Sequence, residues 1–380
     1  MAQIKPDMET FAKIKVVGVG GGGGNIISRM VESKIQGVEF IAINADSQDL
    51  HHCLAQQKLL IGKNLTKGLG AGMNPDIGRQ AAEENRDEIH EVLKGADLVF
   101  VTCGLGGGVG TGAAPIVAEA ARDIGALTVG VVTKPFSFEG SQRMRLGLEG
   151  LNRLQDKVDT LITIPNDKLL QTIDRNTSLM DAFKVVDDVL RQAVQGISDI
   201  IVTPGLVNVD FADLKAVMTG AGSALMGIGR AAGDDRATVA AKMAINSPLL
   251  EVSIDGAKGV IFNVAGGDDM TMMEINEAAK VITDSIDPNA KVIFGAVTDK
   301  QLKKGEIKIT VIAAGFGEIA AKKENQERRE RAEVKTEAAS RQEAPVAAAK
   351  KQPDFSGKVS QIENSDEEWD IPAFIRKKMK

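Results

Sequence analysis

A turn with six glycines constrains this chain more than any other feature. It occupies residues 104–112 in the stretch VTCGLGGGVGTGAAPIVAEAA, between an apolar run and an alanine-rich segment typical of a helix. Dense glycine lets backbone N–H groups approach an anion closely, and the following helix start adds the positive end of its dipole. A Walker-type loop would continue with Lys and then Ser or Thr, whereas this one continues with Ala113, Ala114 and Pro115. The stretch therefore predicts a phosphate site that works without a lysine.

Length and composition bound the class of protein. At 380 residues with 43% hydrophobic content, the chain is long enough for two globular domains. The start MAQIKPDMET lacks a secretory signal, and no apolar run reaches the roughly 18 residues of a membrane span, so we expect a cytoplasmic protein without direct membrane insertion. The cysteines Cys53 and Cys103 are expected to be reduced thiols. The net charge of -6 and the 3% aromatic content argue against a nucleic-acid partner.

The order of the elements predicts an α/β architecture. From Ile14 the chain reads strand, glycine turn, helix and strand, and a similar unit recurs at residues 96–133, which is typical of βαβ units on a parallel sheet. Residues 178–200 have apolar side chains at helical spacing and are predicted to form one long helix. A separate α/β domain is predicted from further helices and strands, near residues 212–219, 236–244, 259–267, 270–286, 291–299 and 306–316.

The composition changes after Gly317. The segment that follows has almost no large apolar residues, and it is predicted to be a flexible linker because it buries too little surface to offset its ordering entropy. The chain then closes with DEEWDIPAFIRKKMK, where Trp369, Ile371, Phe374 and Ile375 lie between an acidic start and a basic end. Such a short apolar cluster predicts a docking segment for a partner.

Two more glycine-rich loops follow earlier strands. Residues 18–25, GVGGGGGN, have GxGxxG spacing and are followed by Asp46 after the next strand, which also fits an NAD-dependent enzyme. Because a dinucleotide fold needs only one pyrophosphate cradle, the second glycine turn favours a run of phosphates instead. Asp46 fits a ribose ligand, but a cap of the following turn is the commoner role. The loop GLGAGMNP at 68–75 fits either a surface turn or a third wall of the same site.

Phe183 and Asp187 lie four residues apart on one face of the long predicted helix. They fit a core aromatic and an ion-pair partner, since buried carboxylates are usually paired. They also fit a purine site, in which the ring stacks on the base and the carboxylate accepts N1–H and N2–H of guanine. Adenine lacks that donor pair, so the pattern favours GTP over ATP.

Acidic residues gather in the stretch NVDFADLK, which contributes Asn208, Asp210 and Asp213. Asp210 fits a helix N-cap and Asp213 a first-turn acid. Spaced carboxylates also orient water and a cation for phosphoanhydride hydrolysis. The long helix separates them by about 25 Å from a nucleotide bound near its start, so they would serve a nucleotide on another subunit. No metal ligands are predicted, because the consecutive side chains of residues 51–53 diverge.

Together these motifs resemble the FtsZ family of bacterial tubulin-like cell-division GTPases. The resemblance covers about residues 11–317 and the last fifteen or so, and rests on GVGGGGGN, GLGAGMNP, GGGVGTGAAP, KPFSFEG, IPNDKL, PGLVNVDFADLK and SPLLE in the family's order. It implies phosphate contacts from Gly21, Gly22, Gly108 and Gly110, with Thr111 in the same loop. It implies ribose and base contacts from Asn25, Glu139, Arg143, Asn166, Phe183 and Asp187. The same loops place Gly23, Gly24, Gly72, Gly107 and Val109 in the expected nucleotide site.

The resemblance also implies a fold and an activity. The fold would be tubulin-like, with a Rossmann-type parallel-sheet GTP-binding domain joined by a long central helix to a second α/β domain. The ligands would be GTP or GDP and Mg²⁺. Subunits would polymerise head to tail, with Asn208, Asp210 and Asp213 completing the catalytic site of the next subunit. The filaments would form the division ring at mid-cell, tethered to the inner face of the membrane by division proteins that bind the C-terminal tail.

Two residues depart from the family pattern: Val109 stands where the family usually reads GGGTGTG, and Met73 occupies a position that usually has a smaller residue. Because Val109 lacks the threonine hydroxyl, the sequence also fits an alternative function, that of a polymer-forming scaffold that binds GTP but hydrolyses it poorly. The predicted organisation has six parts: a flexible N-terminus (1–10), a GTP-binding domain (11–178), a central helix (179–202), a second α/β domain with the catalytic loop (203–317), a disordered linker (318–365) and a partner-binding tail (366–380).

Overall fold

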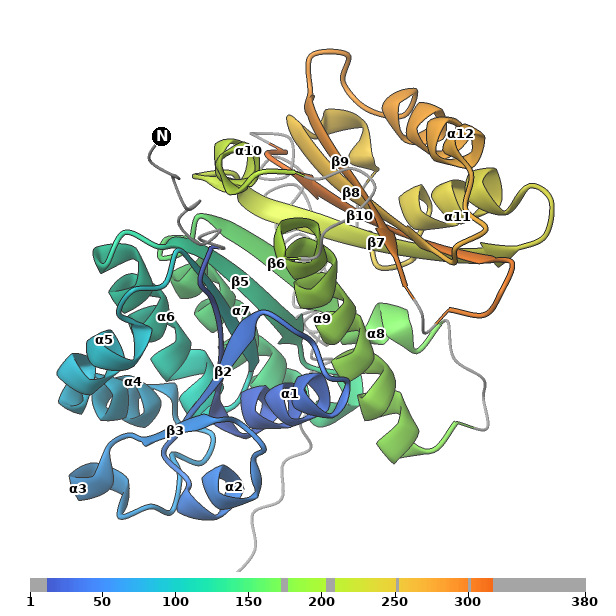
Figure 1. The fold of residues 1–380 in the computed structure, drawn as a ribbon. Coiled ribbons are helices and arrows are strands. Elements are labelled where there is room, and N and C mark those ends of the chain that lie inside the picture. The colour runs from blue at the N-terminus through green and yellow to red at the C-terminus, as the bar shows by residue number, and fades with distance from the viewer. Residues whose placement is uncertain (1–11, 172–176, 203–208, 251–252, 300–301, 317–380) are drawn as a thin grey trace, which may run out of the picture. The chain divides into compact units, whose positions relative to one another are not determined.

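The computed structural model describes residues 12–171, 177–202, 209–250, 253–299 and 302–316. The N-terminus, Asn208, the predicted linker and the predicted tail lie outside these ranges. The described strands form a ten-stranded sheet in the order β3-β2-β1-β4-β5-β6-β7-β10-β8-β9 (Figure 1). The strands are β1 (Ile14–Val19), β2 (Val38–Asn44), β3 (Gln57–Leu60), β4 (Leu98–Gly104), β5 (Leu127–Lys134), β6 (Thr160–Pro165), β7 (Gly222–Ala232), β8 (Gly259–Gly266), β9 (Lys291–Thr298) and β10 (Glu306–Ala314).

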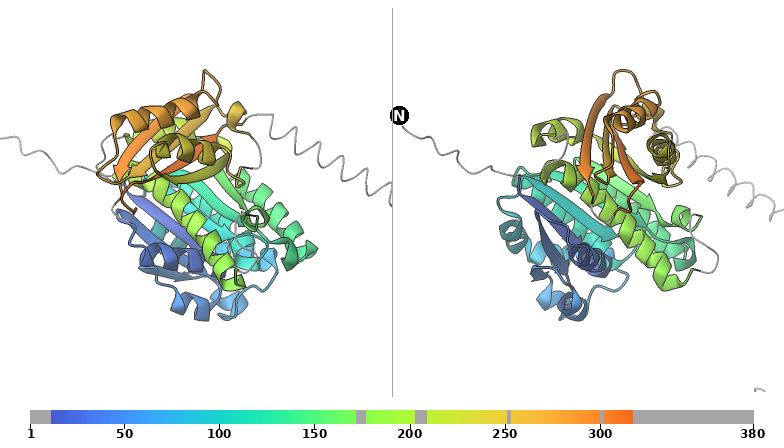
Figure 2. Two further views of the ribbon diagram at one scale, coloured as in Figure 1. Left: turned by 90° about the vertical axis from the view of Figure 1, so that its right-hand side faces the viewer. Right: turned by 45° about the vertical axis from the view of Figure 1, so that its right-hand side comes forward.

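Helices cover both faces of the sheet. Strands β1 to β6 are parallel, with α1 and α9 on one face and α4 to α7 on the other (Figures 1 and 2). The helical segments are α1 (Gly20–Glu32), α2 (Ser47–His52), α3 (Lys63–Thr66), α4 (Pro75–Glu84), α5 (Arg86–Leu93), α6 (Gly108–Asp123), η1 (Ser137–Glu139), α7 (Ser141–Gln155), α8 (Asn166–Leu169), α9 (Leu179–Val202), α10 (Phe211–Met218), α11 (Arg236–Ile245), η2 (Ile254–Gly256) and α12 (Met272–Thr283). None of the helices in the described ranges is both long and apolar enough to cross a membrane.

The sheet has a hydrophobic core layer on each of its two faces, because side chains alternate between the faces along each strand. Successive side chains of a strand point to opposite faces, so Val16 packs toward α1 and α9 while Val17 packs toward α4 to α6. Both residues are fully buried, and Val16 pairs in register with Phe40 of β2 and Phe100 of β4. Near-continuous apolar runs are typical of parallel strands buried on both faces.

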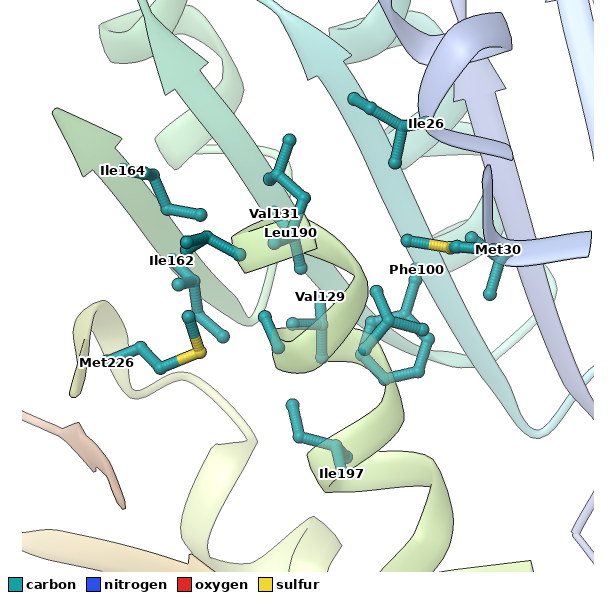
Figure 3. Close-up of a cluster of buried hydrophobic side chains, with 14 of the residues drawn as sticks. Ile26, Met30, Phe100, Val129, Val131, Ile162, Ile164, Leu190, Ile197 and Met226 are labelled. Atoms are coloured by element: carbon teal, nitrogen blue, oxygen red, sulfur yellow. The ribbon is translucent and has the colours of Figure 1, made fainter. Parts of the chain in front are cut away.

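The predicted long helix is observed as α9. Its apolar stripe is fully buried at Leu190, Val194 and Ile197. Figure 3 shows Leu190 and Ile197 of this stripe against side chains of the central strands, including Phe100 and Val129. The same core cluster continues to residues of β7, β8 and β10, so one helix packs on both halves of the sheet.

Strand β7 is one of the elements that the sequence pattern did not indicate. Its sequence, GSALMGIGRAA, is rich in glycine, which usually weakens a strand. Here Gly227 and Gly229 lie against α11, because a Cβ at either position would be 2.0 Å from a helix carbonyl oxygen, that of Ala244 or Ala240. The glycines therefore allow α11 to pack directly on the strand. Strand β7 pairs in parallel with β6 and antiparallel with β10, which joins the two halves by backbone hydrogen bonds.

Candidate functional site

A cleft of about 520 Å³ lies where several parallel strands end. In open α/β sheets this carboxyl edge is the usual place for a ligand. Thirteen of the residues predicted for a nucleotide site line it: Gly21, Gly22, Asn25, Gly72, Gly107, Gly108, Val109, Gly110, Glu139, Arg143, Asn166, Phe183 and Asp187. The structure thus brings together residues from segments far apart in the sequence.

The three glycine-rich loops meet at one end of the cleft. The Gly108 N–H donates to the carbonyl oxygen of Gly72 at 2.9 Å. A Cβ at Gly20 would lie 2.8 Å from the backbone nitrogen of Gly110, so side chains at this contact would separate the loops. The loop at 68–75 is therefore a wall of the cleft rather than an isolated surface turn.

Two helices begin at this end without a side-chain cap. Helix α1 starts at Gly20 and α6 starts at Gly108, and neither N-cap residue, Val19 or Gly107, offers a side-chain hydrogen bond. The first N–H groups of a helix need partners from outside it, and the helix dipole makes an anion favourable there. By contrast, α2 and α4 are capped by Asp46 and Asn74. The arrangement can hold phosphates with backbone donors alone.

Polar and aromatic side chains line the remainder of the cleft. Glu139 and Arg143 form an ion pair of 3.1 Å. Six buried side-chain atoms have no hydrogen-bond partner within the described part of the chain, and two of them belong to cleft residues, the Nε of Arg143 and the Oδ1 of Asn166. Buried polar atoms are almost always satisfied, so these two indicate a polar ligand. Phe183 is 37% exposed and forms a T-shaped pair with Phe136, with ring centroids 5.4 Å apart.

Asp187 has a partner that the sequence did not identify. The Nε of Arg29 in α1 donates to its Oδ2 at 2.8 Å. Burial raises the pKa of the Asp187 carboxyl, and the hydrogen bond and charge of Arg29 act in the opposite direction. The ion-pair interpretation of Asp187 is thus observed, and the same carboxylate also lines the cleft.

Three predicted residues do not line this cleft. Gly23 packs α1 on the sheet, because a Cβ there would lie 2.8 Å from the carbonyl oxygen of Thr102. Gly24 lies beside Cys53, whose thiol donates to the Gly24 carbonyl oxygen at 3.4 Å. The Thr111 hydroxyl is buried and accepts a hydrogen bond of 2.8 Å from the Gly106 N–H. In the structure Gly23 and Thr111 are buried behind the glycine loops, and Gly24 lines a smaller neighbouring cavity with Gly21 and Asn25.

The acidic residues predicted for catalysis lie elsewhere. Asp210 and Asp213 are at the start of α10 and are not among the cleft residues, while Asn208 is outside the described ranges. Asp210 caps α10 by accepting a 2.7 Å hydrogen bond from the Asp213 N–H. The N-cap role that the sequence suggested for Asp210 is therefore observed. Helix α9 leads away from the cleft, and its length from Asp187 to its last residue, Val202, is about 22 Å.

The cleft also contains residues that the motifs did not identify. Thr133 lies near the end of β5 and Pro135 follows that strand, while Asn44 ends β2 and Asp49 lies in α2, which comes next. Their position at strand carboxyl ends was the available signal. Asp46 lines the cleft too, but its side chain accepts from Gln48 N–H and caps α2. Nowhere in the described ranges do three His, Cys, Asp or Glu side chains gather as metal ligands.

Comparisons with known proteins agree with the fold. Residues 13–174 match the model of the Tubulin/FtsZ family, GTPase domain, and residues 222–317 that of the FtsZ family, C-terminal domain. A solved structure described as an empty FtsZ dimer from M. jannaschii is 48% identical, with a TM-score of 0.79, over 82% of this chain and 90% of that chain.

Two more distant structures share the fold. CetZ1 from Haloferax volcanii, a GDP-bound monomer, is 22% identical with a TM-score of 0.71, over 83% of this chain and 98% of that chain. CetZ2 from the same organism, a GTPγS-bound protofilament, is 20% identical with a TM-score of 0.69, over 86% and 99% of the two chains. The extent of the family matches and the 48% identity over most of both chains decide the assignment. This chain belongs to the FtsZ family of tubulin-like GTPases.

Proposed function

We propose that this protein binds and hydrolyses GTP and polymerises head to tail into filaments that form the division ring of a bacterial cell. The observation that carries the proposal is the pair of uncapped helix starts, α1 and α6, at the glycine-rich end of one cleft. Their N–H groups would hold the phosphates, which accounts for a phosphate site without a lysine. The family assignment supplies the reaction class.

The rest of the cleft suits a guanine nucleoside. Glu139 and Arg143 would hold the ribose, and the unpartnered Nε of Arg143 supplies a donor. Phe183 would stack on the base, and Asp187 would accept its N1–H and N2–H. The unpartnered Oδ1 of Asn166 is a further acceptor at this end. Each of these assignments remains a proposal for mutagenesis.

Mg²⁺ would be held chiefly by the nucleotide. Magnesium in phosphate sites is usually bound by one or two carboxylates together with substrate phosphates and water. Asp46 and Asp49 line the glycine-rich part of the cleft, so the donor set fits the ion. When bound, Mg²⁺ would neutralise charge on the phosphates.

Hydrolysis would require a second subunit. Asp210 and Asp213 lie at α10, away from the cleft of their own chain, so a neighbour's α10 region, with Asn208, would complete the site. Such a contact joins two different surfaces, and repeated without closure it makes a filament. The relative from M. jannaschii is described as a dimer, which is in keeping with self-association.

Recruitment is proposed from the sequence alone. The tail at 366–380 would bind membrane-tethering and regulatory division proteins through Trp369, Ile371, Phe374 and Ile375. The predicted linker at 318–365 would separate it from the GTP-binding domain (11–178), the central helix (179–202) and the second domain (203–317). The protein would act in the cytoplasm, at the inner face of the membrane at mid-cell.

Sedimentation tests the proposed function. Purified protein is incubated with Mg²⁺ and either GTP or GDP and pelleted, while phosphate release is measured in the same samples. We expect polymer and phosphate with GTP and neither with GDP. Polymer without phosphate release would favour the alternative, a scaffold that hydrolyses GTP weakly. That alternative rests on Val109, whose buried side chain in the phosphate loop is apolar. Absence of both would contradict the proposal.

A further inference from the structure

The Arg29–Asp187 ion pair links two helices that both line the cleft. Helix α1 contributes Gly21, Gly22 and Asn25 to the lining, and Arg29 lies in its last turn. Helix α9 contributes Phe183 and Asp187. Arg29 itself is not among the lining residues, so its guanidinium acts on the cleft through Asp187.

The pairing leaves part of the carboxylate available. Arg29 donates to Oδ2, and within the described ranges Asp187 Oδ1 has no hydrogen-bond donor. An ionised carboxylate accepts about four hydrogen bonds, so both oxygens keep lone pairs for a ligand. A side chain held by a charged hydrogen bond is fixed in orientation before the ligand arrives.

We propose that Arg29 is a positioning residue that holds Asp187 ready for the N1–H and N2–H pair of guanine, and thereby sets the preference for guanine over purines without a 2-amino group. This inference rests on the proposed GTP site. A fixed carboxylate meets both donors at once, whereas a mobile one meets a single N1–H almost as well. The preference therefore depends on the orientation that Arg29 imposes.

The charge of Arg29 has a second effect on Asp187. Burial raises the pKa of this carboxyl, and Arg29 is the group that opposes the rise. The other charged groups nearby are paired among themselves: Lys184 with Asp181 and Arg191 with Asp188 on α9, and Arg143 with Glu139 across the cleft. Without Arg29 the pKa would rise further. Guanine binding needs the ionised carboxylate. As pH falls, a chain without Arg29 would therefore begin to lose its affinity for guanine nucleotides at a higher pH than the native chain does.

Two variants separate charge from packing. Arg29→Met keeps the apolar stem of the side chain but removes the charge, whereas Arg29→Lys keeps stem and charge. Lys184→Met is the matched control, because it removes one positive charge from α9 at an exposed pair that does not involve Asp187. Nucleotide-free protein is titrated calorimetrically with GDP and with inosine diphosphate, which lacks the 2-amino group, from pH 5 to pH 8.

We expect the native chain and Lys184→Met to prefer GDP by about tenfold. Arg29→Met should bind GDP about tenfold more weakly at pH 7, prefer it by less than about threefold, and lose affinity at a higher pH than the native chain. Arg29→Lys should keep most of the native preference. An unchanged preference and pH profile in Arg29→Met, or equal losses in Arg29→Met and Arg29→Lys, would overturn the inference while leaving the GTP site intact. A native chain that binds neither nucleotide would overturn the proposed function itself.

Discussion

Gly78 of α4 lies directly against the carbonyl oxygen of Gly108, the first residue of α6. A Cβ at Gly78 would be 2.3 Å from that oxygen, closer than two such atoms can approach. The next turns of the two helices are as close, since a Cβ at Gly112 would lie 1.9 Å from the carbonyl oxygen of Pro75. Helix α4 thus supports the phosphate loop through backbone contact.

Replacing Gly78 with Ala should displace the glycine loop. The added methyl group must push α4 from α6, so we expect a loss of about 1–3 kcal/mol in the free energy of unfolding and weaker GDP binding. Chemical denaturation and calorimetry measure the two effects. The control is Gln80→Ala, an exposed change on the same helix. Native GDP affinity in Gly78→Ala would show that the loop does not depend on this contact.

The two acids of α10 should separate stability from catalysis. Asp210 caps the helix with its side chain, whereas Asp213 takes part through its backbone N–H. We expect Asp210→Ala to lose about 1 kcal/mol of stability together with GTPase activity. Asp213→Ala should lose the activity with its melting temperature nearly unchanged. A fully active Asp213→Ala protein would remove this residue from the proposed catalytic set.

Val109 should limit hydrolysis more than binding. Its side chain is buried beside the phosphate loop and carries no hydroxyl for phosphate or cation. A charged hydrogen bond contributes roughly 1.5–3 kcal/mol, so Val109→Thr should raise GTP turnover about tenfold or more if the bond forms in the transition state. Turnover is compared at equal polymer mass, with Val109→Ala as the variant without hydroxyl. Equal or lower turnover in Val109→Thr would show that the hydroxyl is not used here.

Asp199 of α9 should make stability depend on pH. Burial raises the pKa of its carboxyl to about 6, opposed by the charges of Lys308 on β10 and Arg191 on α9 and by a hydrogen bond from Gln195. Asp299, which pairs with Lys308 at 3.2 Å, adds to the rise. Since the folded pKa is raised, folding favours the protonated form. The stabilisation is complete at low pH and is lost as pH rises through about 6.

Asp199→Asn tests this dependence. The variant should be more stable than the native chain at pH 7, by on the order of 2 kcal/mol, with a smaller difference at pH 4.5. Urea denaturation at both pH values gives the comparison. Asp284→Asn, an exposed change with the same charge difference, should show no such trend. A native chain and an Asp199→Asn variant with parallel pH profiles would contradict the assignment.

The sequence was informative where periodicity and turn chemistry act locally. The apolar spacing from Phe183 to Ile197 predicted α9, and the glycine-rich loops at 18–25 and 104–112 predicted walls of the cleft, whereas the loop at 68–75 fitted either a wall or a surface turn. Strand β7 was missed because its glycines are explained only by the approach of α11, a tertiary contact. Sequence alone gave no signal for such an approach.

The sequence also did not show which side chains pair with one another. From the sequence, Asp187 fitted either an ion pair or a base contact. The choice stayed open because its partner, Arg29, is far from it in the sequence, in another helix. The backing roles of Gly23 and Thr111 likewise depend on what lies behind the loop. A motif shows which residues belong to a loop, but it does not show which of them face the ligand.

The dependence of GTP turnover on protein concentration tests the shared site most directly. Phosphate release per subunit is measured with Mg²⁺ and saturating GTP, from dilutions without polymer to concentrations at which most protein sediments. Because the cleft and the α10 acids belong to different parts of the chain, we expect almost no turnover below a threshold and a steep rise above it. Constant turnover per subunit down to the highest dilution would contradict a site completed by a neighbouring subunit.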